Sequence, residues 1–200
     1  MLPIKSKFKI AKRLGPNIFE QTQSQKFALS DTRFKKSKRR GRGASDYGRQ
    51  LLEKQRVRFT YGIPETQLSN YAKVAYEAAD PSTTLHVLLE TRADSVLYRA
   101  GFAPTRRAAR QIVSHGHVLV NGKRTNVPSF ALKKGDVLTV REGSKKSPLF
   151  AGLAESEGRV VPQWLAVDRG TLTIELKGEP VYTPAETTLD YATVFEFYSR

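Results

Sequence analysis

The dipeptide Asn121-Gly122 lies between two short runs, HVLV and KRTNV, that have the alternating character of strands. Because a type I′ turn needs positive φ at both central residues, Asn-Gly in this setting predicts a tight antiparallel hairpin. The turn at 134–136 is predicted to lead into a third strand, VLTVRE. The turn at 168–170 is predicted to join two more, WLAVD and TLTIELK. The second half of the chain is thus predicted to contain five short strands.

Helical patterns precede these strands. Ser45 and Asp46 favour a helix start, because a hydroxyl caps free N–H groups and an acid suits the positive end of the helix dipole. The apolar residues that follow on one side of this helix, and that we expect to be buried, are Tyr47, Leu51, Leu52 and Phe59. Further helices are predicted over 65–78, from residue 85, over 92–101 and over 105–114, whereas 143–148 is predicted to be a loop. These elements place the chain in the α+β class.

The charge of the chain limits its partners. Lys and Arg number 34 against 19 Asp and Glu, and the surplus lies in the first three quarters of the chain. Such a surplus favours a polyanionic partner, because each cation that meets a phosphate releases a counterion. The absence of cysteine excludes disulfides, thiol nucleophiles and cysteine-ligated metals. No apolar run reaches 18 residues, so we expect no transmembrane helix and no membrane partner.

The densest positive charge lies at 33–42, where seven of ten residues are Lys or Arg. A run of like charges repels itself, so we expect disorder here in the free protein and ordered structure to begin at Ser45. The alternatives are a solvated tail and an arm that becomes ordered against phosphate, and the basic segments downstream favour the arm. The arginines expected to contact RNA from this part of the chain are Arg39, Arg40, Arg42 and Arg49.

The predicted helix over 105–114 has two unlike faces. One face is apolar, and the other carries Arg106, Arg107, Arg110, Gln111 and Ser114. No acid on this helix pairs with the arginines, so we expect them to face outward, where guanidinium groups suit paired phosphate oxygens. The alternative to phosphate binding is an ordinary solvated helix face without a partner.

Polar residues continue directly after this helix. His115 and His117 are expected to contact sugar or phosphate, or to cap the helix C-terminus. A metal site is not expected, because zinc would need two further ligands and neither cysteine nor an acid lies nearby. Asn121, Lys123 and Arg124 extend the expected RNA-binding surface to the tip of the hairpin.

The segment RADSVLYRAGFAPTRRAARQIVSHGHVLVNGKRTNVPSF resembles the RNA-binding module of the small-subunit ribosomal protein S-four family. SDYGRQLLEKQRVRFTYGI resembles the first helix of that family's N-terminal domain, and VFEFYSR resembles its C-terminal signature. The resemblance implies a helical N-terminal domain with an inserted module of two short helices packed on a small antiparallel sheet. The implied division is a basic arm at 1–44, a helical domain at 45–90 onto which the tail 185–200 packs, and an RNA-binding domain at 91–184 with its module at 91–142.

The same resemblance implies a structural constituent of the small ribosomal subunit. It would bind small-subunit ribosomal RNA, nucleate subunit assembly and contribute to translational accuracy and messenger entry, beside ribosomal proteins S-five and S-three. Messenger RNA is a further expected partner of the basic arm; ribosomal RNA alone is the alternative. The implied place is the ribosome of a bacterial cytoplasm or of an organelle. No cofactor and no small-molecule substrate are implied. The remaining residues expected to bind RNA are Lys54, Arg56, Arg92 and Arg99.

An RNA-modifying enzyme, such as a pseudouridine synthase that carries the same module, is the alternative function. Only 43 residues follow position 157, and they contain no P-loop, cofactor motif or acid–base constellation. The pair Arg92 and Asp94 weakly resembles a synthase signature, but we expect Arg92 to contact phosphate and Asp94 to cap or pair. No catalytic residue is therefore predicted. Some relatives carry a cysteine-ligated zinc in the arm, which this chain lacks, so RNA contacts or packing must order its arm.

Overall fold

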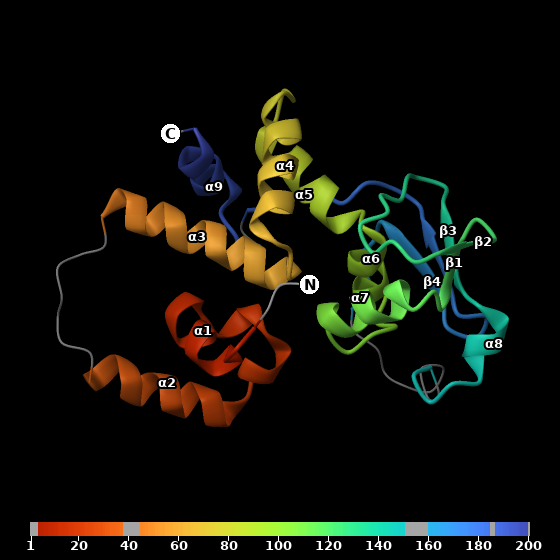
Figure 1. Cartoon of the computed structure of the whole chain (residues 1–200), viewed down its shortest axis with the longest axis horizontal. Coiled ribbons are helices and arrows are strands. Elements are labelled where there is room, and N and C mark those ends of the chain that lie inside the picture. The colour runs from red at the N-terminus through yellow and green to blue at the C-terminus, as the bar shows by residue number, and fades with distance from the viewer. Residues whose placement is uncertain (1–3, 38–44, 151–159, 185–186, 200) are drawn as a thin grey trace. The chain divides into compact units, whose positions relative to one another are not determined.

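A computed structural model describes residues 4–37, 45–150, 160–184 and 187–199 (Figure 1). The chain forms two compact units. The first contains the residues up to Leu85 together with those from Tyr182 onward, and the second contains His86–Val181. Helices and a small antiparallel sheet together give the α+β class that the sequence predicts.

The first unit is helical. Its elements are α1 (Lys7–Leu14), two short 3₁₀ turns (Pro16–Ile18 and Glu20–Thr22), α2 (Gln25–Ser37), α3 (Asp46–Tyr61), α4 (Glu65–Tyr76) and α9 (Tyr191–Tyr198). As predicted, the hydroxyl of Ser45 caps α3 by accepting from the N–H of Gly48 at 3.2 Å. Gly62 ends α3 in the left-handed conformation with φ of 63°.

Helix α5 (Pro81–Glu90) leads from the first unit into the second. It begins four residues before the predicted start because the Asp80 carboxylate accepts from the N–H groups of Ser82 and Thr83 at 3.1 and 3.2 Å. Proline at the first helical position needs no hydrogen-bond partner for its nitrogen, so Pro81 starts the helix rather than breaking it.

The expectation that ordered structure begins at Ser45 is wrong. Helices α1 and α2 precede it, and Ala11, Leu14, Ile18, Phe19 and Phe27 form a small buried cluster there. The burial of these side chains gives this part of the chain a core of its own. Its high positive charge led us to expect disorder instead. The first five residues of the basic run, 33–37, belong to α2. Arg39, Arg40 and Arg42 lie outside the described residues.

The buried face of α3 also differs from the predicted stripe. It consists of Gln50, Lys54, Val57 and Tyr61, whereas Tyr47 is 50% exposed. Lys54 is buried because it has partners: its Nζ lies 2.8 Å from Glu65 Oε1 and 4.2 Å from the Phe197 ring centroid. Leu52 and Phe59 are half-buried and pack on the cluster beside α1. Helix α3 thus packs on two different elements, α9 and the cluster beside α1, and not through one apolar stripe.

Helix α9 packs on α3 and is fixed by polar contacts inside the first unit. The Tyr191 and Tyr61 hydroxyls lie 3.2 Å apart, and Gln50 Nε2 donates to Glu196 at 3.0 Å. The Tyr198 hydroxyl donates to Glu65 at 2.9 Å. Burial, together with this bond to a carboxylate, raises the pKa of the Tyr198 phenol above its usual value. Helix α9 is therefore part of the core of the first unit.

The second unit packs two helices on the sheet. Its elements are α6 (Ala93–Arg99), α7 (Arg106–Ser114), β1 (Val118–Val120), β2 (Lys123–Thr125), β3 (Val137–Val140), α8 (Glu142–Lys145), β4 (Leu165–Asp168) and β5 (Thr173–Leu176). The strand order is β2-β1-β3-β5-β4, and every pair is antiparallel. The short helix α8 corrects the loop predicted over 143–148. It forms because Ser144 is buried there and its hydroxyl bonds to His117.

The predicted hairpin is confirmed. Val120 pairs with Lys123, and the turn residues Asn121 and Gly122 have φ of 49° and 78°. Positive φ at both positions is the requirement that selects Asn-Gly at a two-residue turn.

We expect removal of residues 190–200 to destabilise the first unit by several kcal/mol. Burial of a large apolar side chain contributes about 1.5–3 kcal/mol, and the lost segment carries the buried Val194 and Phe195. Hydrogen exchange should speed up in α3 and α4 and stay unchanged in the sheet. Unchanged protection of α3 would contradict this packing.

Candidate RNA interface

Helix α7 is held on the second unit by its apolar face. The Thr105 hydroxyl caps it by accepting from the Ala108 N–H at 3.0 Å. Ala109, Ile112 and Val113 are buried in the same hydrophobic core as the sheet. The spacing of these residues fixes the opposite side of the helix toward the surface, where Arg107, Gln111 and Ser114 are exposed.

Arg106 does not share that exposure. Its side chain is 12% exposed, and Nη2 lies 3.0 Å from Glu90 Oε1. Arg99 binds both oxygens of the same carboxylate, at 2.8 and 2.7 Å. The Glu90 side chain is 1% exposed, so one buried carboxylate at the end of α5 holds arginines from α6 and α7.

Asp94 makes a second set of buried ion pairs. Arg92 binds both of its oxygens, at 3.0 and 2.9 Å, and the Arg92 side chain is 2% exposed. Arg110 donates to Asp94 Oδ2 from Nε at 2.8 Å. Breaking such a pair is costly, because the remaining partner is left as a buried charge.

These contacts correct two expectations. Arg106 and Arg110 do not simply face solvent, and ion pairs do account for their position, with acids that come from α5 and α6 rather than from α7. Arg92 is buried against Asp94, so a solvent-facing phosphate contact does not explain it, whereas the pairing expected of Asp94 is present. The helical periodicity of one segment could not reveal partners that lie 16 residues away in sequence.

The loop after α7 is joined to the hairpin by Arg124. Its Nη2 donates to the carbonyl of His115 at 3.3 Å, and its guanidinium lies over Gly116. A Cβ on residue 116 would overlap this guanidinium, and φ of 71° further favours glycine there. Arg124 is thereby held beside the exposed His115, on the surface that α7 begins.

His117 is half-buried below this loop. Its Nδ1 lies 2.9 Å from the Ser144 hydroxyl. Burial first, and then the neighbouring charges of His115, Arg141 and Arg124, lower the pKa of the His117 imidazole. Positive groups therefore surround this ring, and His117 is neutral at pH 7 with a structural partner.

The hairpin tip carries residues of two kinds. Lys123 is exposed, whereas the amide of Asn121 binds within the protein, accepting from the Val137 N–H at 2.9 Å and donating to Asp136 at 2.8 Å. Further exposed cations of this unit, which the sequence pattern did not indicate as RNA contacts, are Lys133, Lys134 and Arg141. Their positions beside predicted turns and strand ends could have indicated that they are exposed.

The expected sites of the first unit that the structure describes, Lys54, Arg56 and Arg49, each have an acidic partner. Lys54 is buried and paired with Glu65, which explains its position without RNA. Arg56 donates from Nε to the carbonyl of Leu14 at 2.7 Å and pairs with Glu53. Arg49 is exposed and pairs with Asp46.

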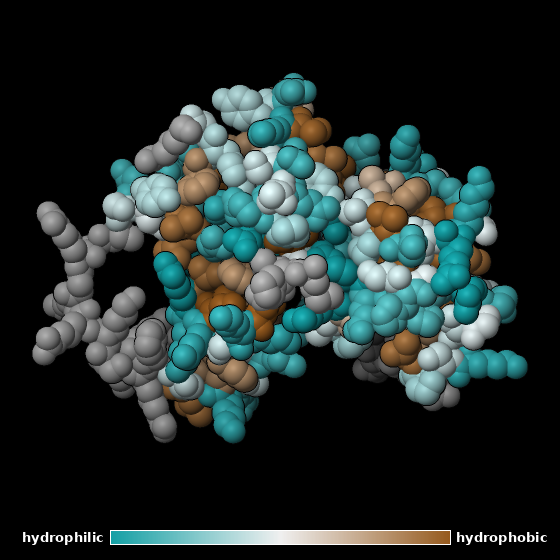
Figure 2. All heavy atoms as spheres, viewed as in Figure 1, coloured by the Kyte–Doolittle hydropathy of each residue, from teal (hydrophilic) through white to brown (hydrophobic). Residues whose placement is uncertain are grey.

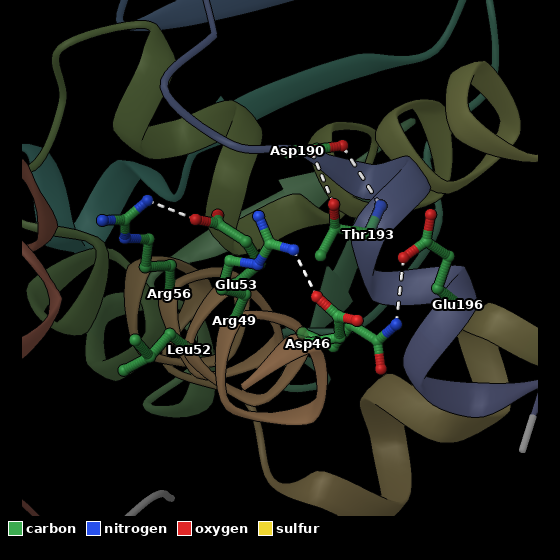
Figure 3. A pocket seen from close by; sticks show the side chains of 9 residues that line it. Asp46, Arg49, Leu52, Glu53, Arg56, Asp190, Thr193 and Glu196 are labelled. Carbon is green, nitrogen blue, oxygen red and sulfur yellow. Dashed lines mark hydrogen bonds and ion pairs between the residues drawn. The ribbon is translucent and has the colours of Figure 1, made fainter. Parts of the chain in front are cut away.

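A groove of about 740 Å³ lies between α3 and α9 in the same unit (Figure 3). Four carboxylates line it, those of Asp46, Glu53, Asp190 and Glu196, together with two arginines, Arg49 and Arg56, that pair with Asp46 and Glu53. The buried atoms Glu53 Oε2 and Gln50 Oε1 have no hydrogen-bond partner in the part of the chain that the structure describes. Burial raises the pKa of Glu53, and the Asp190 charge adds to this effect against the opposing charge of Arg56.

Two negative findings apply to the described residues alone. No helix among them is both long and apolar enough to cross a membrane. No group of three or more His, Asp or Glu side chains among them is arranged to hold a metal ion. Figure 2 shows hydrophilic side chains over much of the visible surface, with hydrophobic side chains between them.

Two family models match this chain. The S4 domain, an RNA-binding domain, matches residues 91–138 and so contains α6, α7 and the hairpin. The ribosomal protein S4/S9 N-terminal domain matches residues 4–90.

Three similar proteins share one name, and each matches this chain over most of its length. The small ribosomal subunit protein uS4 of Lachnospira eligens is 44% identical over 168 residues, which cover 83% of this chain and 85% of the relative. That of Roseiflexus castenholzii is 39% identical over 198 residues, 96% of each chain. That of Chromobacterium violaceum is 39% identical over 200 residues, 97% of each chain. This chain belongs to the uS4 family of small-subunit ribosomal proteins, a family of structural proteins and not of enzymes. The alternative of an RNA-modifying enzyme finds no support.

We expect Arg110→Ala to lower the stability of the second unit by about 1.5–3 kcal/mol, because Asp94 stays buried and keeps only Arg92 as its partner. Arg106→Ala should act in the same direction through Glu90. Arg107→Ala, on the exposed face of the same helix, should change stability by less than about 0.5 kcal/mol. Thermal melts of the three variants test this, and equal melting temperatures would contradict the paired arrangement.

Proposed function

We propose that this protein binds small-subunit ribosomal RNA directly through the surface formed by α7, the loop 115–117 and the β1–β2 hairpin. The observation that supports this most is the line of exposed polar and basic side chains along these three elements. Its members are Arg107, Gln111, Ser114, His115, Lys123 and Arg124.

The ion pairs behind this surface favour recognition of a folded RNA. Arg99, Arg106 and Arg110 are held by Glu90 and Asp94, so they contribute positive potential from fixed positions. Four guanidinium groups face two carboxylates in this network, which leaves a surplus of positive charge close to the exposed face. Fixed charges suit a rigid A-form backbone, whose narrow major groove hides the base edges.

The finer functions follow from the family resemblance. We propose that the protein helps to nucleate small-subunit assembly and contributes to translational accuracy, with the bacterial cytoplasm as its place and an organelle as the alternative. Contact of Arg39, Arg40, Arg42 and Arg49 with messenger RNA stays a prediction from their charge. For Arg49, an exposed side chain is consistent with it.

RNA binding is tested by titration with the protein's own small-subunit ribosomal RNA and with duplex DNA of equal length. We expect at least several-fold tighter binding to the RNA and a steep loss of affinity with salt. Arg107→Ala should weaken RNA binding and reduce the salt slope by about one, as for one phosphate contact. Lys73→Ala, an exposed lysine on α4, is the charge-matched control and should leave both values unchanged. Equal affinity for RNA and DNA would contradict the proposal.

The groove between α3 and α9 is suited to a basic side chain of a neighbouring ribosomal protein. We propose ribosomal protein S-five as that neighbour, with S-three also nearby. The four carboxylates of the groove outnumber the two arginines that line it, so an entering guanidinium or ammonium group would meet a surplus of negative charge.

Glu53→Gln should therefore weaken binding to purified S-five about tenfold, because it removes one of the four negative charges that line the groove. Glu77→Gln, an exposed acid at the end of α4, has the same charge change and should bind as the unaltered protein does. Calorimetry of the three proteins measures the difference. Equal affinities of the two variants would rule out this use of the groove.

A further inference from the structure

Two turns lie side by side at one end of the five-stranded sheet. Asn121 and Gly122 join β1 to β2, and residues 133–136 lead into β3. Strands β1 and β3 are antiparallel, so the end of β1 lies beside the start of β3. The N–H of Asn121 donates to the carbonyl of Val137 at 2.8 Å, which joins the two segments directly.

Side-chain hydrogen bonds fix the two turns to each other. Asp136 Oδ1 accepts from Asn121 Nδ2 at 2.8 Å, and Asp136 Oδ2 accepts from the Lys133 N–H at 2.7 Å. These two bonds lower the pKa of the Asp136 carboxyl, with the Lys133 N–H as the larger cause, so the group is ionised at neutral pH. The N–H of Gly135 donates to the carbonyl of Leu176 at 2.8 Å and ties the second turn to β5.

Four exposed lysines surround this end of the sheet, and we call them the lysine end: Lys123, Lys133, Lys134 and Lys177. Lys177 belongs here because it follows Leu176, which bonds to Gly135. A Cβ on Gly122 or Gly135 would have no neighbour within 4 Å, so the space in front of both turns is open. Compact ammonium groups before an open turn are suited to attract phosphate.

The chemistry of the lysine end favours RNA over a protein partner. Lysine is depleted in protein interfaces, whereas it is a regular ligand of nucleic-acid phosphates. Strand β1, which has three residues, separates the lysine end from the loop 115–117, and this separation is about 10 Å. A separate part of the RNA backbone would therefore meet it.

We propose that the lysine end is a second contact for the RNA backbone, and that Asn121 and Asp136 are positioning residues that hold its two turns in place. This proposal rests on the proposed RNA-binding function. It gives Asn121 a role different from the direct RNA contact expected from the sequence, and it adds Lys133, Lys134 and Lys177 to the RNA-binding surface.

The first test removes charge from the lysine end. Lys133→Ala combined with Lys134→Ala should weaken binding to small-subunit ribosomal RNA at least tenfold and reduce the salt slope by about two. The melting temperature should stay unchanged, because both side chains are exposed. Lys73→Ala on α4 controls for loss of an exposed lysine from the other unit, and Lys133→Arg with Lys134→Arg should retain binding.

The second test separates position from charge. Asp136→Asn removes one negative charge but leaves a single oxygen acceptor for the two bonds from Asn121 and Lys133, and we expect RNA binding to weaken several-fold. Glu142→Gln removes the same charge from an exposed site in the same unit and should bind as tightly as the unaltered protein or more tightly. Melting curves exclude an unfolded variant as the reason. Asp136→Asn that binds as Glu142→Gln does would overturn the positioning role.

The failure of this proposal is distinct from failure of the proposed function. If the unaltered protein does not prefer its RNA, the proposed function itself fails. The other case is that the unaltered protein prefers its RNA and Arg107→Ala weakens this binding. If the Lys133 and Lys134 variant then keeps the full affinity and the full salt slope, only the second contact is refuted. Loss of binding to a ribosomal protein with RNA affinity intact would likewise overturn it, in favour of a protein interface.

Discussion

The ion pairs of Glu90 and Asp94 are the interaction on which the second unit depends most. Two carboxylates, 1% and 4% exposed, hold four arginines from α6, α7 and the residue that precedes α6. Buried charges are tolerated only when they are paired with good geometry, and here Glu90 and Asp94 each accept a two-pronged arginine. Any shift of α7 along α6 would separate these partners, so the network sets the position of the helix that carries the exposed polar face.

The network also divides α7 into two layers. Arg106 and Arg110 form an inner layer that is bound to acids, with Arg106 additionally 4.6 Å from the Tyr98 ring centroid. Arg107, Gln111 and Ser114 form an outer layer that is open to solvent. A partner therefore meets side chains whose support is already ordered, which reduces the entropy lost on binding. The Arg124 guanidinium over Gly116 extends the same principle to the loop and hairpin.

Local signals allowed much of this fold to be predicted. The Asn121-Gly122 hairpin, the Ser45 cap and the apolar face of α7 each depend on residues a few positions apart, and the structure confirms all three. What the sequence did not reveal depends on contacts between distant residues. Glu90 pairs with Arg106. Lys54 is buried because it pairs with Glu65 and lies over the Phe197 ring. Phe19 and Phe27 belong to a buried cluster in the basic N-terminal segment. Charge counted along the chain cannot distinguish an exposed arginine from one that a distant acid has buried.

The most direct measurement is a structure of this protein bound to its small-subunit ribosomal RNA. We expect phosphate oxygens within hydrogen-bonding distance of the Arg107 and Arg124 guanidinium groups. Glu90 and Asp94 should keep their arginine partners in the complex. A structure in which Arg106 and Arg110 have left these carboxylates to bind phosphate, while Arg107 faces solvent, would contradict this expectation.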